Sequence, residues 1–198
     1  LAVAVLLTLI SGFDFFIRLA RSEERAINLP NTITTLRFLF VPFLVYSILS
    51  SNSTWSLVFI CLIIVSDKPD GLSARFTAQI TSFGRKYDAF ADFTVITTVA
   101  ITLHLASYFS LQWLLLLLLP IIMNLFIKPI YFVKKHELFS TGLGKIVIGM
   151  SYITIVAYLI SFPYRHTLLA LTISIAYFYV ILDLLHLLDK KIPRPWKK

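Results

Sequence analysis

Four aspartates fall into two closely spaced pairs within one polar stretch, VSDKPDGLSARFTAQITSFGRKYDAFAD. Asp67 and Asp70 are three residues apart, and Asp88 and Asp92 are four apart. Each pair therefore shares one face if its segment is helical. Two such helices, facing each other across a turn, would bring all four carboxylates together.

A cluster of four unpaired carboxylates is costly at the end of an apolar segment, because like charges repel and little water is present to solvate them. A divalent metal removes most of this cost. Ligands that are all oxygen favour Mg²⁺, Mn²⁺ or Ca²⁺ over zinc. Two metals about 4 Å apart would suit phosphoryl chemistry. The spacing of the aspartates therefore predicts a site for hard divalent cations.

Small and basic residues accompany the aspartates. Gly71 and Ala74 follow the first pair and Gly84 precedes the second, so a ligand can approach the backbone closely. Arg75 offers a guanidinium fork that matches phosphate oxygens. Taken singly, a glycine usually serves packing, and an arginine near a membrane surface usually extends toward lipid headgroups. Together with the aspartates, these residues at fixed spacing indicate a site for a phosphorylated ligand.

The elements that must position this stretch are strongly apolar. The chain is 58% hydrophobic with a mean hydropathy of +0.85, and a helix needs about 20 apolar residues to cross a bilayer. We predict an all-α integral membrane protein with six transmembrane helices, the second and third extending into the acidic stretch. Their expected ranges are Thr32–Leu49, Trp55–Ser66, Ala89–Tyr108, Leu111–Val133, Lys145–Phe162 and Leu168–Leu188.

The two ends of the chain differ from this apolar body. Residues 1–17 are apolar and are expected either to span the membrane or to lie in its interface, and RLARSEERAI at Arg18–Ile27 predicts a short interfacial helix. No basic region precedes the apolar segment, so a cleaved signal peptide is not predicted. We expect three regions, namely 1–27, a six-helix domain over 28–189, and a basic cytoplasmic tail over 190–198.

The basic residues predict an orientation. If the acidic stretch faces the cytoplasm and the spans alternate, 17 of the 18 Lys and Arg residues lie on or near the cytoplasmic side, and only Arg165 lies on the other. The prediction is a protein of the cell membrane with its site at the cytoplasmic side. The net charge of +8 is interpreted as orientation and as attraction to anionic lipid and phosphate. Nucleic-acid binding is not expected.

The remaining polar residues carry weaker signals. Cys61 is the single cysteine, which excludes an intrachain disulfide and a cysteine-based metal site, and its apolar surroundings predict a buried structural thiol. His104 lies in the third predicted span, and Asp183 and His186 lie in the sixth. Hydrogen bonds between helices are the favoured role for these three residues over catalysis.

The acidic stretch as a whole is similar to the signature of the CDP-alcohol phosphotransferases, which is DxxDGxxAR, eight residues, then GxxxDxxxD. All eight specified residues are present. The resemblance covers about residues 28–188. It implies a membrane enzyme that binds a CDP-linked alcohol, such as CDP-diacylglycerol, at a site with two Mg²⁺ or Mn²⁺ ions. An acceptor hydroxyl attacks the β-phosphorus and CMP leaves. The resemblance also implies a homodimer.

The resemblance assigns roles to the motif residues. It implies that Asp67, Asp70 and Asp88 are metal ligands, and that Asp92 is the general base toward the acceptor hydroxyl while also contacting metal. The CDP pocket would be lined by Asp67 together with Gly71, Ala74, Arg75 and Gly84.

Two further segments bear on the acceptor. NLPNTITTLRFLFVP at Asn28–Pro42 and TGLGKIVIG at Thr141–Gly149 resemble segments of bacterial phosphatidylglycerophosphate synthases, a subgroup of the family that uses sn-glycerol 3-phosphate. Such an acceptor needs a cationic pocket for its phosphate. The candidates on the cytoplasmic side are Arg37, Lys134, Lys135 and Lys145.

Departures from that subgroup leave alternatives open. Phe93 and Ile148 stand where those synthases usually have Lys and Thr, and Lys68 and Pro69 are unusual between the first aspartates. Inositol phosphate, inositol, serine or a lipid hydroxyl, as in cardiolipin synthesis, are alternative acceptors. A divalent-cation transporter is disfavoured, because the carboxylates cluster at one membrane face and Arg75 would repel cations. An inactive scaffold is disfavoured because the motif is complete.

Overall fold

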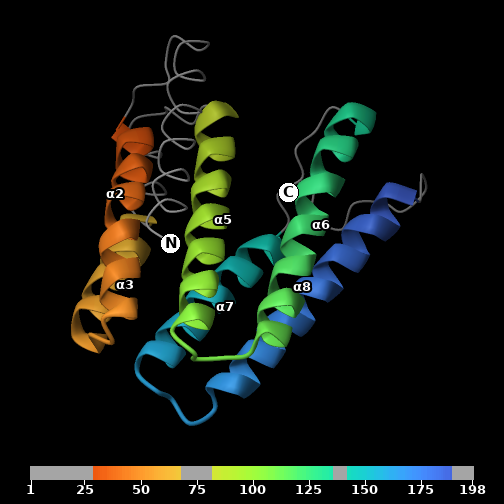
Figure 1. The fold of residues 1–198 in the computed structure, drawn as a ribbon. Coiled ribbons are helices and arrows are strands. Elements are labelled where there is room, and N and C mark those ends of the chain that lie inside the picture. The colour runs from red at the N-terminus through yellow and green to blue at the C-terminus, as the bar shows by residue number, and fades with distance from the viewer. Residues whose placement is uncertain (1–28, 68–81, 136–141, 189–198) are drawn as a thin grey trace. The chain divides into compact units, whose positions relative to one another are not determined.

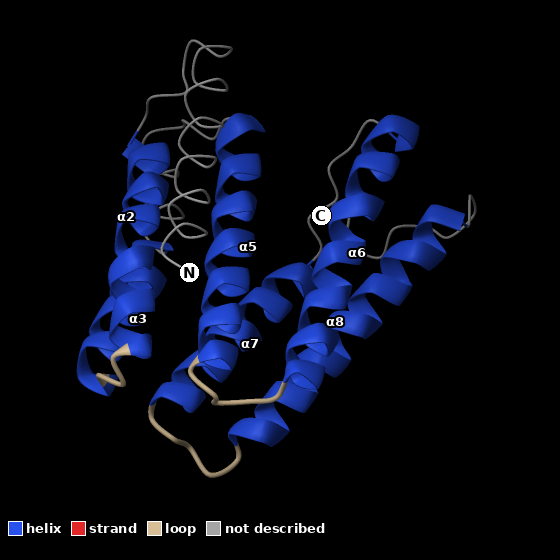
Figure 2. Cartoon of the chain, in the orientation of Figure 1, coloured by secondary structure: helices blue, strands red, loops and turns tan. Residues whose placement is uncertain are grey.

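The computed structural model describes residues 29–67, 82–135 and 142–188, and within these ranges all regular structure is helical (Figures 1 and 2). The predicted all-α class is confirmed for this part of the chain. The motif residues Asp70, Gly71, Ala74 and Arg75 lie outside the described residues. The six helices are α2 (Leu29–Leu49), α3 (Ser53–Asp67), α5 (Ser82–Leu105), α6 (Leu111–Lys135), α7 (Gly142–Leu159) and α8 (Arg165–Leu188).

The chain divides into two compact units, Leu1–Tyr108 and Phe109–Lys198. In the first unit α2 packs against both α3 and α5. The buried residues of α2 recur every three or four positions, which is the spacing of one helix face. They are Thr34, Arg37, Phe38, Val41, Leu44, Val45, Ser47 and Ile48. This face continues without interruption through a charged residue, Arg37.

The second unit has α8 packed against α6 and α7. The buried face of α8 shows the same helical spacing, at Leu169, Thr172, Ile173, Ala176, Tyr179, Val180 and Asp183. The hydroxyls of Thr154 and Thr172 are 2.8 Å apart across the α7–α8 contact. At the end of α7, the Tyr158 hydroxyl lies 3.0 Å from Nδ1 of His166. The threonine pair is buried within the contact, and the Tyr158–His166 pair is partly exposed at its end.

Three helices end in the same way, with a serine in the left-handed conformation. The φ angles are 54° at Ser51, 63° at Ser107 and 54° at Ser161. After α2, the Asn52 N–H donates to the Ser47 carbonyl and the Ser51 N–H donates to that of Ile48. This pair of bonds is the Schellman motif, and equivalent bonds follow α5 and α7.

Two of the described helices are long and apolar enough to cross a membrane, over Asp88–Leu105 and Arg165–Leu185. Four shorter apolar helices accompany them, at Thr34–Leu49, Ser53–Ser66, Leu111–Asn124 and Leu143–Leu159. The outward faces also carry large apolar side chains, among them Leu39, Phe43, Leu115, Phe178 and Ile181, each more than half exposed. These helices are therefore apolar on more than their packing faces.

One sequence-based expectation needs correction. Cys61 was predicted to be buried, but it is exposed, because Ile60 and Ile63 occupy the packing face of α3. The third helix begins at Ser82, so it continues beyond its apolar range at Ala89 into the acidic stretch, as predicted for this span. The other predicted ranges agree with the observed helices to within three residues at each end.

The left-handed serines generate a test of stability. Replacing Ser51 by Gly removes the steric cost of the left-handed conformation, and the more flexible unfolded chain offsets part of the gain. We expect Ser51→Gly to raise the free energy of unfolding by about 0.5–1 kcal/mol, or the melting temperature in detergent by about 1–4 °C. Ser50→Gly is the matched control, since Ser50 has no positive φ. An equal gain in both variants would contradict this explanation.

Candidate active site

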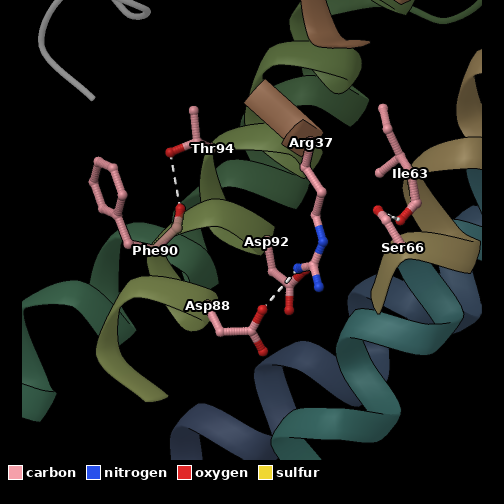
Figure 3. Close-up of polar contacts among 7 residues, drawn as sticks. All are labelled: Arg37, Ile63, Ser66, Asp88, Phe90, Asp92 and Thr94. Carbon is pink, nitrogen blue, oxygen red and sulfur yellow. Dashed lines mark hydrogen bonds and ion pairs between the residues drawn. The ribbon is translucent and has the colours of Figure 1, made fainter. Parts of the chain in front are cut away.

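The C-terminal end of α3 and the N-terminal halves of α2 and α5 belong to the same end of the first unit. A tight connection over Ser50–Asn52 makes α2 and α3 an antiparallel pair, while α5 runs beside α2 in the same direction (Figure 1). Helix α3 ends at Asp67, the first aspartate of the motif. In its last turn the Ser66 hydroxyl donates to the Ile63 carbonyl at 2.7 Å (Figure 3).

Asp88 and Asp92 lie on the face of α5 that packs against the rest of the unit. The buried positions Ala91, Val95 and Val99 continue this face away from the motif. The two carboxylates differ in access to solvent, since the Asp88 side chain is 37% exposed and that of Asp92 is 8% exposed. The helix thus presents one outer and one inner carboxylate, one turn apart.

Arg37 of α2 joins the two carboxylates. Its Nη1 donates to Oδ1 of Asp88 at 2.8 Å and to Oδ1 of Asp92 at 3.2 Å (Figure 3). The Arg37 side chain is fully buried. Beside this ion pair, the rings of Phe38 and Phe90 pack with their centroids 6.3 Å apart, again between α2 and α5. The acidic pair is therefore anchored to the neighbouring helix by charge and by aromatic packing.

The arrangement of these side chains fits a divalent cation. Asp88 and Asp92 both bond to one nitrogen of Arg37, so their carboxylates converge at one place. The donors are carboxylate oxygens, as Mg²⁺ and Mn²⁺ prefer. In the described ranges no group of three or more His, Cys, Asp or Glu residues converges, and Asp70 lies outside them.

The positions of the other predicted site residues are known from the helices that carry them. Gly84 is in the first turn of α5. In the second unit, Lys134 and Lys135 end α6, and Lys145 is exposed near the start of α7. The pairing of Arg37 with the aspartates was not foreseen from the sequence. The helical spacing of Thr34, Arg37 and Val41 was the available signal, because it places Arg37 on the packing face.

Comparison with known proteins now decides the family. A family model described as CDP-alcohol phosphatidyltransferase matches residues 27–182, which include α2, α3, α5, α6 and α7 and most of α8. The chain belongs to this family. The resemblance read from the acidic motif is thereby confirmed. The family is one of enzymes, and its members use a CDP-alcohol and a hydroxyl acceptor in phospholipid biosynthesis.

The chain is similar to proteins of mycobacteria. Proteins named "Putative cardiolipin synthase" from Mycobacterium bovis and from two strains of Mycobacterium tuberculosis are each 27% identical to this chain over 135 residues. The match covers 62% of this chain and 65% of each relative. The chain thus spans slightly less than two thirds of the length of these relatives.

The carboxylates on α5 generate a test of metal binding that does not depend on activity. A ligand at about 100 times its Kd stabilises a protein by about 2.7 kcal/mol. We expect saturating Mg²⁺ or Mn²⁺ to raise the melting temperature of the purified protein, and Asp88→Asn to abolish most of that increase. Asp183→Asn is the matched control, because Asp183 is a buried aspartate of α8 outside the motif. Loss of the metal-dependent increase in both variants would argue against a site on α5.

Proposed function

We propose that this protein is an integral membrane phosphatidyltransferase. It would transfer the phosphatidyl group of CDP-diacylglycerol to the hydroxyl of sn-glycerol 3-phosphate, releasing CMP and forming phosphatidylglycerophosphate. The observation that carries the proposal is the convergence of Asp88 and Asp92 of α5 on one nitrogen of Arg37. They are the last two aspartates of a complete family motif.

The reaction is a substitution at phosphorus. The acceptor hydroxyl oxygen forms a bond to the β-phosphorus, the bond from that phosphorus to the bridging oxygen breaks, and CMP leaves with the electron pair. Asp92 would accept the hydroxyl proton, as a carboxylate within hydrogen-bond reach can. Divalent metal held by Asp67, Asp70, Asp88 and Asp92 would neutralise the diphosphate and make CMP a better leaving group.

The donor pocket would be formed by residues around the aspartates. Arg75 would donate to phosphate oxygens in a forked geometry. Asp67, Gly71, Ala74 and Gly84 would complete the CDP pocket, with the small residues leaving room for the nucleotide. Among these, Gly84 lies one turn before Asp88 on α5, the helix that carries both described carboxylates.

A membrane location is supported by the outer surfaces of the helices. Large apolar side chains more than half exposed, such as Leu39 and Phe178, suit contact with lipid. Two of the described helices are long and apolar enough to cross a membrane. The basic residues favour a cytoplasmic site by the positive-inside rule. We therefore propose the cytoplasmic membrane as the location. A homodimer, implied by the family resemblance, stays a prediction.

The most specific part of the proposal is the identity of the acceptor alcohol. For glycerol 3-phosphate, the candidate phosphate ligands in the second unit are Lys134, Lys135 and the exposed Lys145. A second candidate acceptor is a lipid hydroxyl, that of phosphatidylglycerol, which would make the product cardiolipin. The observation that favours it is the name of the mycobacterial relatives. Both candidates use the same donor and release CMP.

The identity of the acceptor can be tested by an assay of CMP release. Purified protein in detergent with CDP-diacylglycerol and Mg²⁺ should release CMP when glycerol 3-phosphate is added, and EDTA should abolish the release. Phosphatidylglycerol, inositol phosphate, inositol and serine are supplied in separate reactions, with the lipid product identified by mass. Release with phosphatidylglycerol alone would support the cardiolipin assignment in place of the first. Metal uptake into proteoliposomes without CMP release would instead support the transporter alternative.

The role of Asp92 as general base can be tested by substitution. Asp92→Asn keeps the size and shape of the side chain but cannot accept the proton as a carboxylate does. We expect the rate of CMP release to fall by about 10²–10⁴-fold, with the protein still inserting in membranes and eluting as a folded species. Asp183→Asn is the control for a buried aspartate outside the motif. A decrease of less than tenfold for Asp92→Asn would rule out Asp92 as the base.

A further inference from the structure

We infer that Arg37 is a positioning residue, which holds Asp88 and Asp92 of α5 in place from α2. This inference rests on the proposed function, since it takes the two aspartates as reacting groups of the site. It gives Arg37 a different role from the binding of an acceptor phosphate.

Burial is the first argument. The Arg37 side chain is fully buried, and its Nη1 is already shared by two carboxylate oxygens, at 2.8 and 3.2 Å. Because the side chain has no exposed surface, the phosphate of a soluble acceptor could reach this guanidinium only if the protein around it moved. By contrast, Lys145 is exposed and is free of that conflict.

Charge is the second argument. A guanidinium stays protonated in proteins, so a buried one requires anionic partners. Asp88 and Asp92 have the converse problem, because like charges four residues apart on a helix repel each other. With all three groups ionised, Arg37 reduces the charge of the pair from −2 to −1. The carboxylates can therefore be assembled before metal binds, while the cluster still attracts a divalent cation.

Helix register is the third argument. Arg37 and Phe38 are neighbours on α2, and their partners on α5 alternate along one segment, with Phe90 between the two aspartates. The ion pair and the ring contact thus bridge the same two helices at the same level. A shift of α5 along α2 would break both contacts together. Arg37 therefore fixes where the carboxylates stand, not only how they are oriented.

The kinetic test compares Arg37→Gln and Arg37→Lys in the full chain, using CMP release with the acceptor that supports turnover. We expect Arg37→Gln to lower kcat by about tenfold or more, with the acceptor KM changing by less than about threefold, because the reacting groups lose their orientation. Arg37→Lys should recover part of kcat, since it keeps the charge without the fork. Lys145→Gln is the contrasting variant, expected to raise the KM for a phosphorylated acceptor. An acceptor KM at least tenfold higher with normal kcat in Arg37→Gln would overturn the inference.

The stability test does not depend on turnover. In metal-free detergent solution, Arg37→Gln should lower the melting temperature by about 5–10 °C, because two facing carboxylates lose their shared cation. We expect Asp92→Asn to offset part of that loss in the double variant, since it removes one of the facing charges. Additive effects would overturn the inference. If the wild-type protein releases no CMP with any acceptor, the proposed function fails, while this cycle still decides whether Arg37 holds the carboxylates.

Discussion

The ion pair between Arg37 and the two aspartates of α5 is the constraint on which the first unit depends. Arg37 and Asp92 are buried on faces that packing would otherwise fill with apolar residues, and the Asp88 side chain is 37% exposed. Burying a guanidinium with no anionic partner would destabilise the fold by roughly several kcal/mol. Burying the inner carboxylate without a cation would have a similar cost. In the observed register of α2 and α5, Arg37 reaches both carboxylates, and this contact favours that register over others. Packing of the apolar residues further along the two helices follows from that register.

The two carboxylates that Arg37 joins differ in their exposure to solvent. Asp92 is almost enclosed, whereas more than a third of the Asp88 side chain is exposed. Neither position follows from hydropathy, since both residues are acidic and one turn apart. The difference follows from where α2 covers α5. An outer carboxylate can be reached from solvent, and an inner one keeps its orientation because protein surrounds it on most sides.

The sequence predicted the helices better than it predicted their faces. Apolar runs locate α2, α6 and α8 well, because length and hydropathy are properties of a segment alone. The first turns of α5 are polar and do not count as a membrane span, so its extension into the acidic stretch was predicted from the aspartate spacing and its exact start at Ser82 was not. Cys61 was misplaced because α3 is apolar all round, so its periodicity does not distinguish packing from exposure. The partners of Arg37 lie 51 and 55 residues away in the sequence, a distance over which only the tertiary structure brings groups together.

The motif itself contains a local conflict that points to function. Two aspartates at positions i and i+4 destabilise an isolated helix by a few tenths of a kcal/mol, and charge at a packing face costs more. A chain under no functional demand would place apolar residues at both positions and leave α2 without an arginine. Local preference and global fold agree in most proteins, and disagreements concentrate at sites of binding and catalysis. Among the described residues of this unit, Arg37, Asp88 and Asp92 show that disagreement. Their compensation by Arg37 within the fold is consistent with the proposal that these carboxylates serve chemistry.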